Sequence, residues 1–150
     1  MKICTVSRII FFILQIIYLL QDIKEMFMVQ TARLFLAGSS IYPAIELLYR
    51  KKTHVSMAVA GGTSLCFIDK VCNGLLKQKS LPVKCVAGSF IITGVELATG
   101  LVVNVMMKRK VWDYSNLPLN IRGQVCLPFT VIWGLITIPA LMICKLLKCK

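Results

Sequence analysis

The sequence has few acidic residues and few charged residues of any kind. Six Asp and Glu residues stand against 18 Lys and Arg residues, and charged residues make up only 16% of the 150. Hydrophobic residues make up 57%, and the mean hydropathy is +0.78. A soluble domain of this length does not normally carry so much apolar sequence, so the composition excludes an ordinary soluble enzyme or binding module.

The shortage of acidic residues leaves a net charge of +12, which in a soluble protein would point to nucleic acid as a partner. Here the basic residues cluster at the ends of apolar runs, at 50–52, at 108–110 and at Lys145, Lys148 and Lys150. This placement is typical of snorkelling side chains and of attraction to anionic lipid. We therefore expect the lipid bilayer, and not nucleic acid, as the partner.

Motifs for cofactor chemistry are missing. There is no Gly-rich loop ending in Lys-Ser or Lys-Thr, so the chain shows no means of binding ATP by that route. The seven cysteines have no C-x-x-C spacing, and the single histidine, His54, has no partners at ligand spacing. We predict free cysteines, no metal and no cofactor. ATP-driven activity would require a separate ATPase subunit.

Five apolar segments predict an all-α, multi-pass integral membrane protein in the cell membrane. Residues 1–25 are predicted to hold a hydrophobic N-terminal helix (1–21) and a linker. No cleavage site follows this helix, so we expect it to be retained, either spanning the bilayer or lying at its interface. Residues 26–150 are predicted to form the membrane domain, with four core transmembrane helices at about 26–49, 55–72, 83–107 and 125–144.

The connections between these segments predict part of the topology. The short connection at 50–54 forces the helices on either side of it into an antiparallel hairpin. Helix 83–107 must return before the last helix begins, so the 50–54 loop and the 108–124 segment are predicted to lie on one membrane face. The basic residues divide almost equally between the two faces, which leaves the orientation open.

Glu96 is predicted to lie near the middle of helix 83–107, where a carboxyl group costs a few kcal/mol, so neighbouring helices should shelter it. Thr93, Glu96, Gly100 and Asn104 follow one slowly rotating stripe of that helix. This stripe is either a site for a cation, a polar ligand or a proton, or a packing surface on which Gly100 lets a neighbour approach closely.

Two other positions carry charge near the expected membrane face. Glu46 lies one helical turn before Arg50, which predicts a structural i, i+4 ion pair. His54 is either an ordinary interfacial histidine or a titrating partner of Asp113. The small residues around Gly61–Gly62 predict close packing between helices.

The segment VWDYSNLPLNIRGQ (111–124) mixes aromatic, polar and turn-forming residues between two apolar runs. Trp112 and Tyr114 suit the headgroup zone of a bilayer. Asp113 is a candidate helix cap, ion-pair partner or ligand. So many polar groups beside two spans predict a shaped, buried segment and not a hydrophilic connector.

Several strings resemble the bacterial family named Putative ABC-transporter type IV, which also includes small vertebrate transmembrane proteins. They are IELLYR (45–50) with THVSM (53–57) and the Gly pair at 61–62, ITGVELATGLVVN (92–104) and VWDYSNLPLNIRGQVCLPF (111–129). The resemblance covers about residues 34–144, and Val55, Lys51 and Lys52 depart from its pattern. The residues that fall on the family's motif positions are Glu46, Arg50, His54, Glu96, Gly100, Asn104, Trp112, Asp113, Asn120, Gly123 and Gln124.

This resemblance implies a permease-like transport component of unknown substrate, working as a homo-oligomer or with a separate ATPase. The alternatives are a non-transporting membrane adaptor or regulator, and a membrane-embedded enzyme that uses Glu96 or Asp113 as acid or base. The enzyme is disfavoured because no nucleophile–base pair is evident. The predicted site lies between helices 26–49, 55–72 and 83–107, under the 111–124 segment. Its candidate ligand-binding residues are Glu96, Asn104, Gly100, Arg50, His54, Asp113, Trp112, Asn120 and Gln124.

Overall fold

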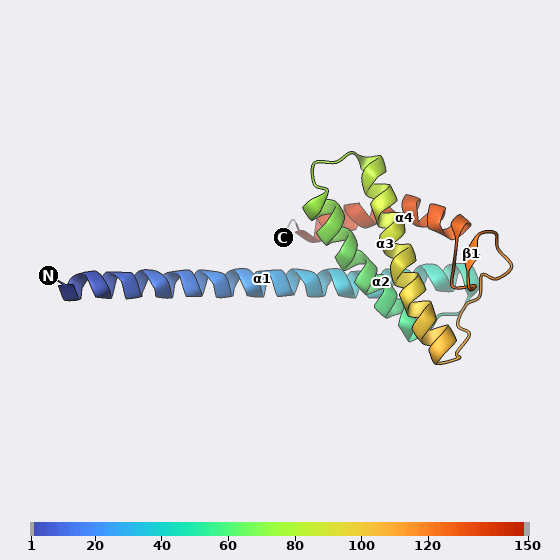
Figure 1. The fold of residues 1–150 in the computed structure, drawn as a ribbon, viewed down its shortest axis with the longest axis horizontal. Helices are drawn as coiled ribbons and strands as arrows, with labels where there is room; N and C mark the ends of the chain where they lie inside the picture. Colours follow the sequence, from blue (N-terminus) through green and yellow to red (C-terminus); the bar gives the residue numbers. More distant parts are fainter. Residues whose placement is uncertain (1, 149–150) are drawn as a thin grey trace. The chain divides into compact units, whose positions relative to one another are not determined.

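The computed structural model describes the backbone of residues 2–148 and the side chains of residues 15–148, and it is nearly all-α (Figure 1). Short π-helical segments, η1 and η2, continue α2 and α3. In chain order the elements are α1 (Lys2–Arg50), α2 (Val55–Ile68), η1 (Asp69–Leu75), α3 (Leu81–Gly100), η2 (Leu101–Met106), β1 (Asn120–Ile121), β2 (Val125–Cys126) and α4 (Leu127–Lys148).

Three helices of the described chain are long and apolar enough to cross a membrane. They are Val55–Leu75, Leu81–Met106 and Leu127–Lys148, and they correspond to the helices predicted at about 55–72, 83–107 and 125–144. The helix predicted to end at about residue 72 continues through Asn73 and Gly74 as a π-helix, with the Leu76 N–H donating to the Val71 carbonyl at 2.7 Å. The all-α prediction needs one correction, since β1 and β2 form a two-residue antiparallel ladder.

α1 is one helix where the sequence predicted two. The residues expected to link them, 22–25, include no glycine or proline, so nothing in this mostly polar stretch interrupts the helical backbone. Pro43 also lies inside α1, which continues to Arg50. The side chains of Lys2 and Arg8 lie outside the described residues. Two compact units are distinguished along the chain, residues 1–32 and residues 33–150.

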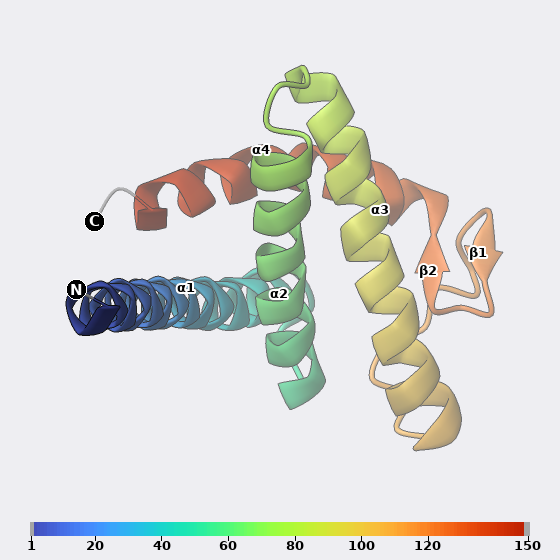
Figure 2. The same cartoon turned by 60° about the vertical axis from the view of Figure 1, so that its left-hand side comes forward.

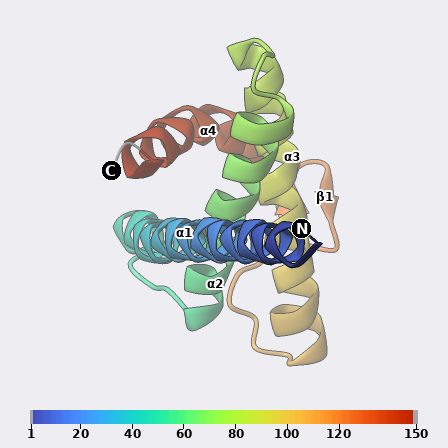
Figure 3. The ribbon, with the colours of Figure 1, turned by 90° about the vertical axis from the view of Figure 1, so that its left-hand side faces the viewer.

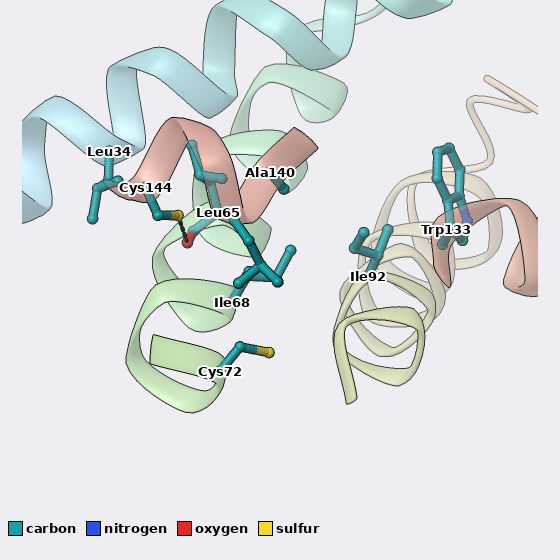
Figure 4. Packing of buried hydrophobic residues seen from close by; sticks show 9 residues of the cluster. Leu34, Leu65, Ile68, Cys72, Ile92, Trp133, Ala140 and Cys144 are labelled. Atoms are coloured by element: carbon teal, nitrogen blue, oxygen red, sulfur yellow. Dashed lines mark hydrogen bonds between the residues drawn. The ribbon is translucent and has the colours of Figure 1, made fainter. Parts of the chain in front are cut away.

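The second unit contains the buried core. α3 packs most extensively against α4 and next against α2, and Figure 2 shows α2 and α3 side by side. At one end of the core, Leu34 of α1 and Leu65 of α2 belong to the same buried cluster as Cys144 of α4 (Figure 4). Ile92 of α3 and Trp133 of α4 extend this cluster toward the candidate site.

Glycines form the crossing between α1 and α2. A Cβ atom on Gly61 would collide with the backbone oxygen of Gly38 and with the Cβ of Tyr42, and one on Gly62 would lie 2.5 Å from Ser39 Oγ. The small residues at this position therefore serve close helix approach, which is the packing role expected for them. The crossing fixes residues 33–50 of α1 against α2.

The glycine crossing predicts opposite effects for two Gly→Ala substitutions. Gly61→Ala should lower the free energy of unfolding by about 1–3 kcal/mol, because the new methyl group has no room. Gly94→Ala, in α3, places its methyl group in open space and should be neutral or stabilising by up to about 1 kcal/mol through helix propensity. Denaturant unfolding in one detergent measures both, and equal effects would contradict the packing role.

Candidate functional site

Glu96 is the centre of a buried hydrogen-bond network. Its side chain is 2% exposed, which confirms that neighbouring segments shelter it. Oε2 accepts a hydrogen bond of 2.9 Å from Trp133 Nε1 of α4. Oε1 accepts two hydrogen bonds of 3.2 Å, from the hydroxyls of Tyr42 in α1 and Tyr114 in the connection before β1. One carboxylate on α3 thus joins three other segments of the chain.

The donors around Glu96 fit an ionised carboxylate. An indole N–H can only donate, and both tyrosine hydroxyls also direct their protons at the carboxylate. Burial, and then the nearby Glu96, raise the pKa of Tyr114, so its hydroxyl keeps its proton. Among residues 15–148 no cationic side chain forms an ion pair with Glu96. Neutral donors in this arrangement would stabilise a negative charge on Glu96 without cancelling it.

A cavity of about 180 Å³ lies beside this network. All three donors to Glu96 belong to its walls, and Phe129 stacks on Tyr114 with ring centroids 4.7 Å apart. The volume exceeds the roughly 150 Å³ of an apolar cavity that holds benzene, so a small ligand group fits. Of the described residues, no group of three or more His, Cys, Asp and Glu side chains is placed to hold a metal ion. The remaining walls are Ile45, Glu46, Tyr49, Arg50, Met57, Ile132 and Ile136.

The predicted ion pair between Glu46 and Arg50 is present at this cavity. Arg50 Nη2 donates to Glu46 Oε1, and the Thr53 hydroxyl donates to Glu46 Oε2 at 2.7 Å. Glu46 is only 6% exposed, so both oxygens of its carboxylate are engaged in a mostly buried setting. The positive charge of Arg50 is therefore already matched within its own helix.

Asn104 and Gly100, also predicted for the site, hold the 111–124 segment against α3 and η2. Figure 3 shows α3 and, next to it in this view, β1 of the segment. Asn104 Nδ2 donates to the Trp112 carbonyl at 3.0 Å and to Gln124 Oε1 at 2.8 Å, while its Oδ1 accepts from the Val111 N–H at 2.7 Å. A Cβ on Gly100 would come 2.5 Å from Gln124 Oε1 and 3.0 Å from the Trp112 ring. These residues position the segment, and none of them belongs to the cavity wall.

A tight hairpin gives the same segment its shape. The Gln124 N–H donates to the Ile121 carbonyl at 2.9 Å, and Arg122 and Gly123 both have positive φ, as a type I′ turn requires. Asn120 supports the turn, because its Oδ1 accepts from the Gly123 N–H at 3.1 Å. Its Nδ2 also donates to the Leu117 carbonyl at 2.8 Å. Asn120 is therefore part of the loop scaffold.

His54 and Asp113 do not pair with each other. His54 caps α2, with its Nδ1 accepting from the Ser56 N–H at 3.2 Å. Asp113 is exposed, and its Oδ1 accepts from the Ser115 N–H at 2.9 Å. This backbone hydrogen bond lowers the pKa of the Asp113 carboxyl, which keeps it ionised. Both residues thus have local structural partners away from the cavity.

Trp112 and Tyr114, predicted for the headgroup zone, both direct their polar atoms at partners within the protein. Trp112 is 3% exposed, and its Nε1 donates to the Gln124 carbonyl at 2.9 Å. The Tyr114 hydroxyl reaches Glu96 at 3.2 Å. Each ring turns inward because its polar atom finds a partner within the protein, as buried Trp and Tyr usually require.

Sequence reasoning missed the aromatic walls of the site and the contribution of α4. Tyr42, Phe129 and Trp133 were not among the candidate residues. A signal was present in the spacing, because Tyr42 precedes Glu46 and Phe129 precedes Trp133 by four residues. Such pairs share one helix face, but the spacing alone does not show that the two faces meet.

Comparison with known protein families assigns the chain to one of them. One family model matches residues 6–148, nearly its whole length. The chain belongs to the family described as Putative ABC-transporter type IV. Comparisons with curated proteins and with solved structures give no match. Together with the three apolar helices, membership of the type IV family supports a membrane location and a role in transport.

Removing one donor to Glu96 should destabilise this type IV family member. Trp133→Phe leaves Oε2 without its donor and should lower the free energy of unfolding by about 1.5–3 kcal/mol, the range for hydrogen bonds to charged groups. Tyr49→Phe is the control, because Tyr49 is 73% exposed and its hydroxyl makes no hydrogen bond within residues 15–148. Unfolding in detergent should separate the two, and two equal midpoints would argue against the network.

The role of Asn104 can be tested by amide hydrogen exchange. Asn104→Asp keeps the acceptor for Val111 but loses both N–H donations, so exchange within 111–126 should quicken about tenfold or more. Asn116→Asp, at an exposed position of the same segment, makes the same chemical change and should have little effect. An unchanged exchange rate in Asn104→Asp would show that the segment holds without this residue.

Proposed function

We propose that the protein is a permease-like component of a transport system in the cell membrane, and that its solute binds in the cavity beside Glu96. The observation that carries the proposal is the uncompensated carboxylate behind the aromatic walls of that cavity. A charge inside a membrane helix is expensive and commonly marks the path of a substrate or ion.

In this function, residues 33–50 of α1 would form a fourth core transmembrane helix. Two contacts support this: the glycine crossing with α2, and Leu34 in the buried cluster that includes Cys144. α1 also supplies Tyr42 and Glu46, without which the site would lack one wall and one carboxylate. Residues 1–32, the separate compact unit at the beginning of α1, would then supply an additional hydrophobic segment that spans the bilayer or lies at its interface.

Two observations favour transport over the adaptor and enzyme alternatives. A carboxylate that only tied helices together would require no cavity, yet its three donors all line one. For an enzyme, the second proposed acid or base would be Asp113, which is exposed and bonded to Ser115, away from the cavity. The energy for ATP-driven movement would come from a separate ATPase subunit, and the chain would form its pathway with that subunit or with further copies of itself.

Transport can be tested in ATP-loaded membrane vesicles from cells with and without the chain. A panel of labelled solutes of differing charge and hydrophobicity should contain one that moves about tenfold faster when the chain is present. Glu96→Gln should remove most of that difference, since losing charge stabilisation of more than 1.4 kcal/mol costs over tenfold. Glu25→Gln, at an exposed position of α1, is the matched control and should retain transport.

Three results would overturn the transport function. One is a panel in which no solute distinguishes the two kinds of vesicle. Another is chemical turnover of a lipid without flux, which would establish the enzyme. The third is a Glu96→Gln variant that transports normally and alters only complex assembly, which would establish the adaptor.

A further inference from the structure

We infer that the site binds a single-chain amphipath with a quaternary ammonium head, and that its alkyl chain lies in a groove between α1 and α4. The inference rests on the proposed function and names the class of its substrate. Three observations support this inference: a second cavity, the direction in which both cavities open, and the charge of the cavity walls.

The cavity beside Glu96, here called the head cavity, has a second cavity next to it. This tail cavity has a volume of about 160 Å³ and shares Tyr42, Ile45 and Ile136 with the head cavity. Its other walls are mainly aliphatic side chains of α1, α2 and α4 and the glycines of the α1–α2 crossing. The shared walls place the two cavities next to each other, as the aromatic, charged end and the apolar end of the inferred groove.

The groove runs along two antiparallel helices. Tyr49 meets Phe129, with ring centroids 6.2 Å apart, and about two turns away along α1 Tyr42 meets Trp133 at 5.6 Å. At the far end, Leu34 shares a buried cluster with Cys144. The head cavity therefore lies nearer the 50–54 loop, and the tail cavity lies further along the helices. An amphipath in one leaflet has this order, with its head at the membrane face and its chain toward the bilayer centre.

The edges of the groove are exposed. Ile41, Ile45 and Tyr49 follow one another at four-residue intervals on α1 and are 37%, 39% and 73% exposed. Ile132 forms part of the opposite edge on α4 and is 42% exposed. Both edges are apolar or aromatic, so the opening faces sideways into hydrocarbon when α1 and α4 span the membrane. A ligand that arrives through this opening must itself be soluble in the bilayer.

The walls of the head cavity favour a cation. Because the hydroxyl protons of Tyr42 and Tyr114 point at Glu96, the lone pairs of their oxygens remain for the cavity. Ring faces attract cations through their quadrupole, and Glu96 adds a negative charge behind them. The other charged groups of the wall, Glu46 and Arg50, neutralise each other.

The same walls favour a quaternary head over a primary amine or a phosphate. A primary ammonium group brings three N–H donors that need acceptors, whereas most of the head-cavity surface is aromatic or aliphatic. A phosphate would need a free cation, and Arg50 is already bonded to Glu46. A trimethylammonium group has neither requirement and binds well to aromatic walls.

Binding of labelled dodecyltrimethylammonium to the full chain in nanodiscs of phosphatidylethanolamine and phosphatidylglycerol tests the head. After subtraction of empty nanodiscs, it should bind about tenfold or more tightly than its uncharged carbon isostere, through cation–π and charge attraction. Glu96→Gln should remove most of this preference, and Glu25→Gln should keep it. Single-chain phosphocholine lipid should bind about tenfold more weakly than the cation, because its phosphate finds no free partner. Equal binding of isostere and cation, or tighter binding of the phosphocholine lipid, would overturn the assignment.

A second pair of variants tests the tail and does not depend on Glu96. Ile143→Trp should fill the tail cavity and weaken dodecyltrimethylammonium binding about tenfold, while tetramethylammonium, which has no chain, is unaffected. Met142→Trp adds the same ring at a neighbouring position that is 60% exposed, and it should bind normally. If Ile143→Trp binds the long-chain cation like the parent, the chain does not lie in this groove.

The binding assay contains no energy source and no partner subunit, so it separates the two proposals. Should the cation bind as expected but cross vesicles no faster with the chain than without it, the transport function fails and the ligand class stands. Should vesicles move a different class of solute in a Glu96-dependent way while the cation does not bind, the ligand class is overturned and the transport function stands.

Discussion

The buried carboxylate of Glu96 is the constraint on which the rest of this fold depends. A charged group in the middle of a membrane helix costs a few kcal/mol unless protein groups replace its solvent. Its three donors come from α1, α4 and the segment before β1, so these must converge on one face of α3. The fold of the 111–124 segment follows, because Tyr114 reaches Glu96 only when the segment turns back over the helix.

The polar residues of the site form two groups with different roles. Glu96, Glu46 and Arg50 contribute charge at or behind the cavity walls. Asn104 and Gln124 hold the loop that carries Tyr114. A family motif can thus include residues that never meet a ligand, since placing one tyrosine correctly requires a folded loop beneath it.

Features that depend on local sequence pattern were predicted correctly, and features that depend on contacts between distant segments were not. Apolar runs located the three long apolar helices, and burial of Glu96 followed from its place in one of them. The i, i+4 spacing predicted the Glu46–Arg50 pair. The inward turn of Trp112 was missed because it depends on one carbonyl, that of Gln124, which only the hairpin brings within reach. The meeting of Tyr42 with Trp133 likewise depends on how α1 packs beside α4, which no local spacing specifies.

Tyr114 links the cavity to the hairpin turn. Its hydroxyl ends at the cavity, while its backbone N–H donates to the Gly123 carbonyl at 2.7 Å in the hairpin turn. The turn is exposed at Arg122 and tightly constrained by its backbone geometry. An occupant that shifts the tyrosine ring would therefore also displace the Tyr114 backbone, and with it the hairpin turn to which that backbone is bonded at Gly123.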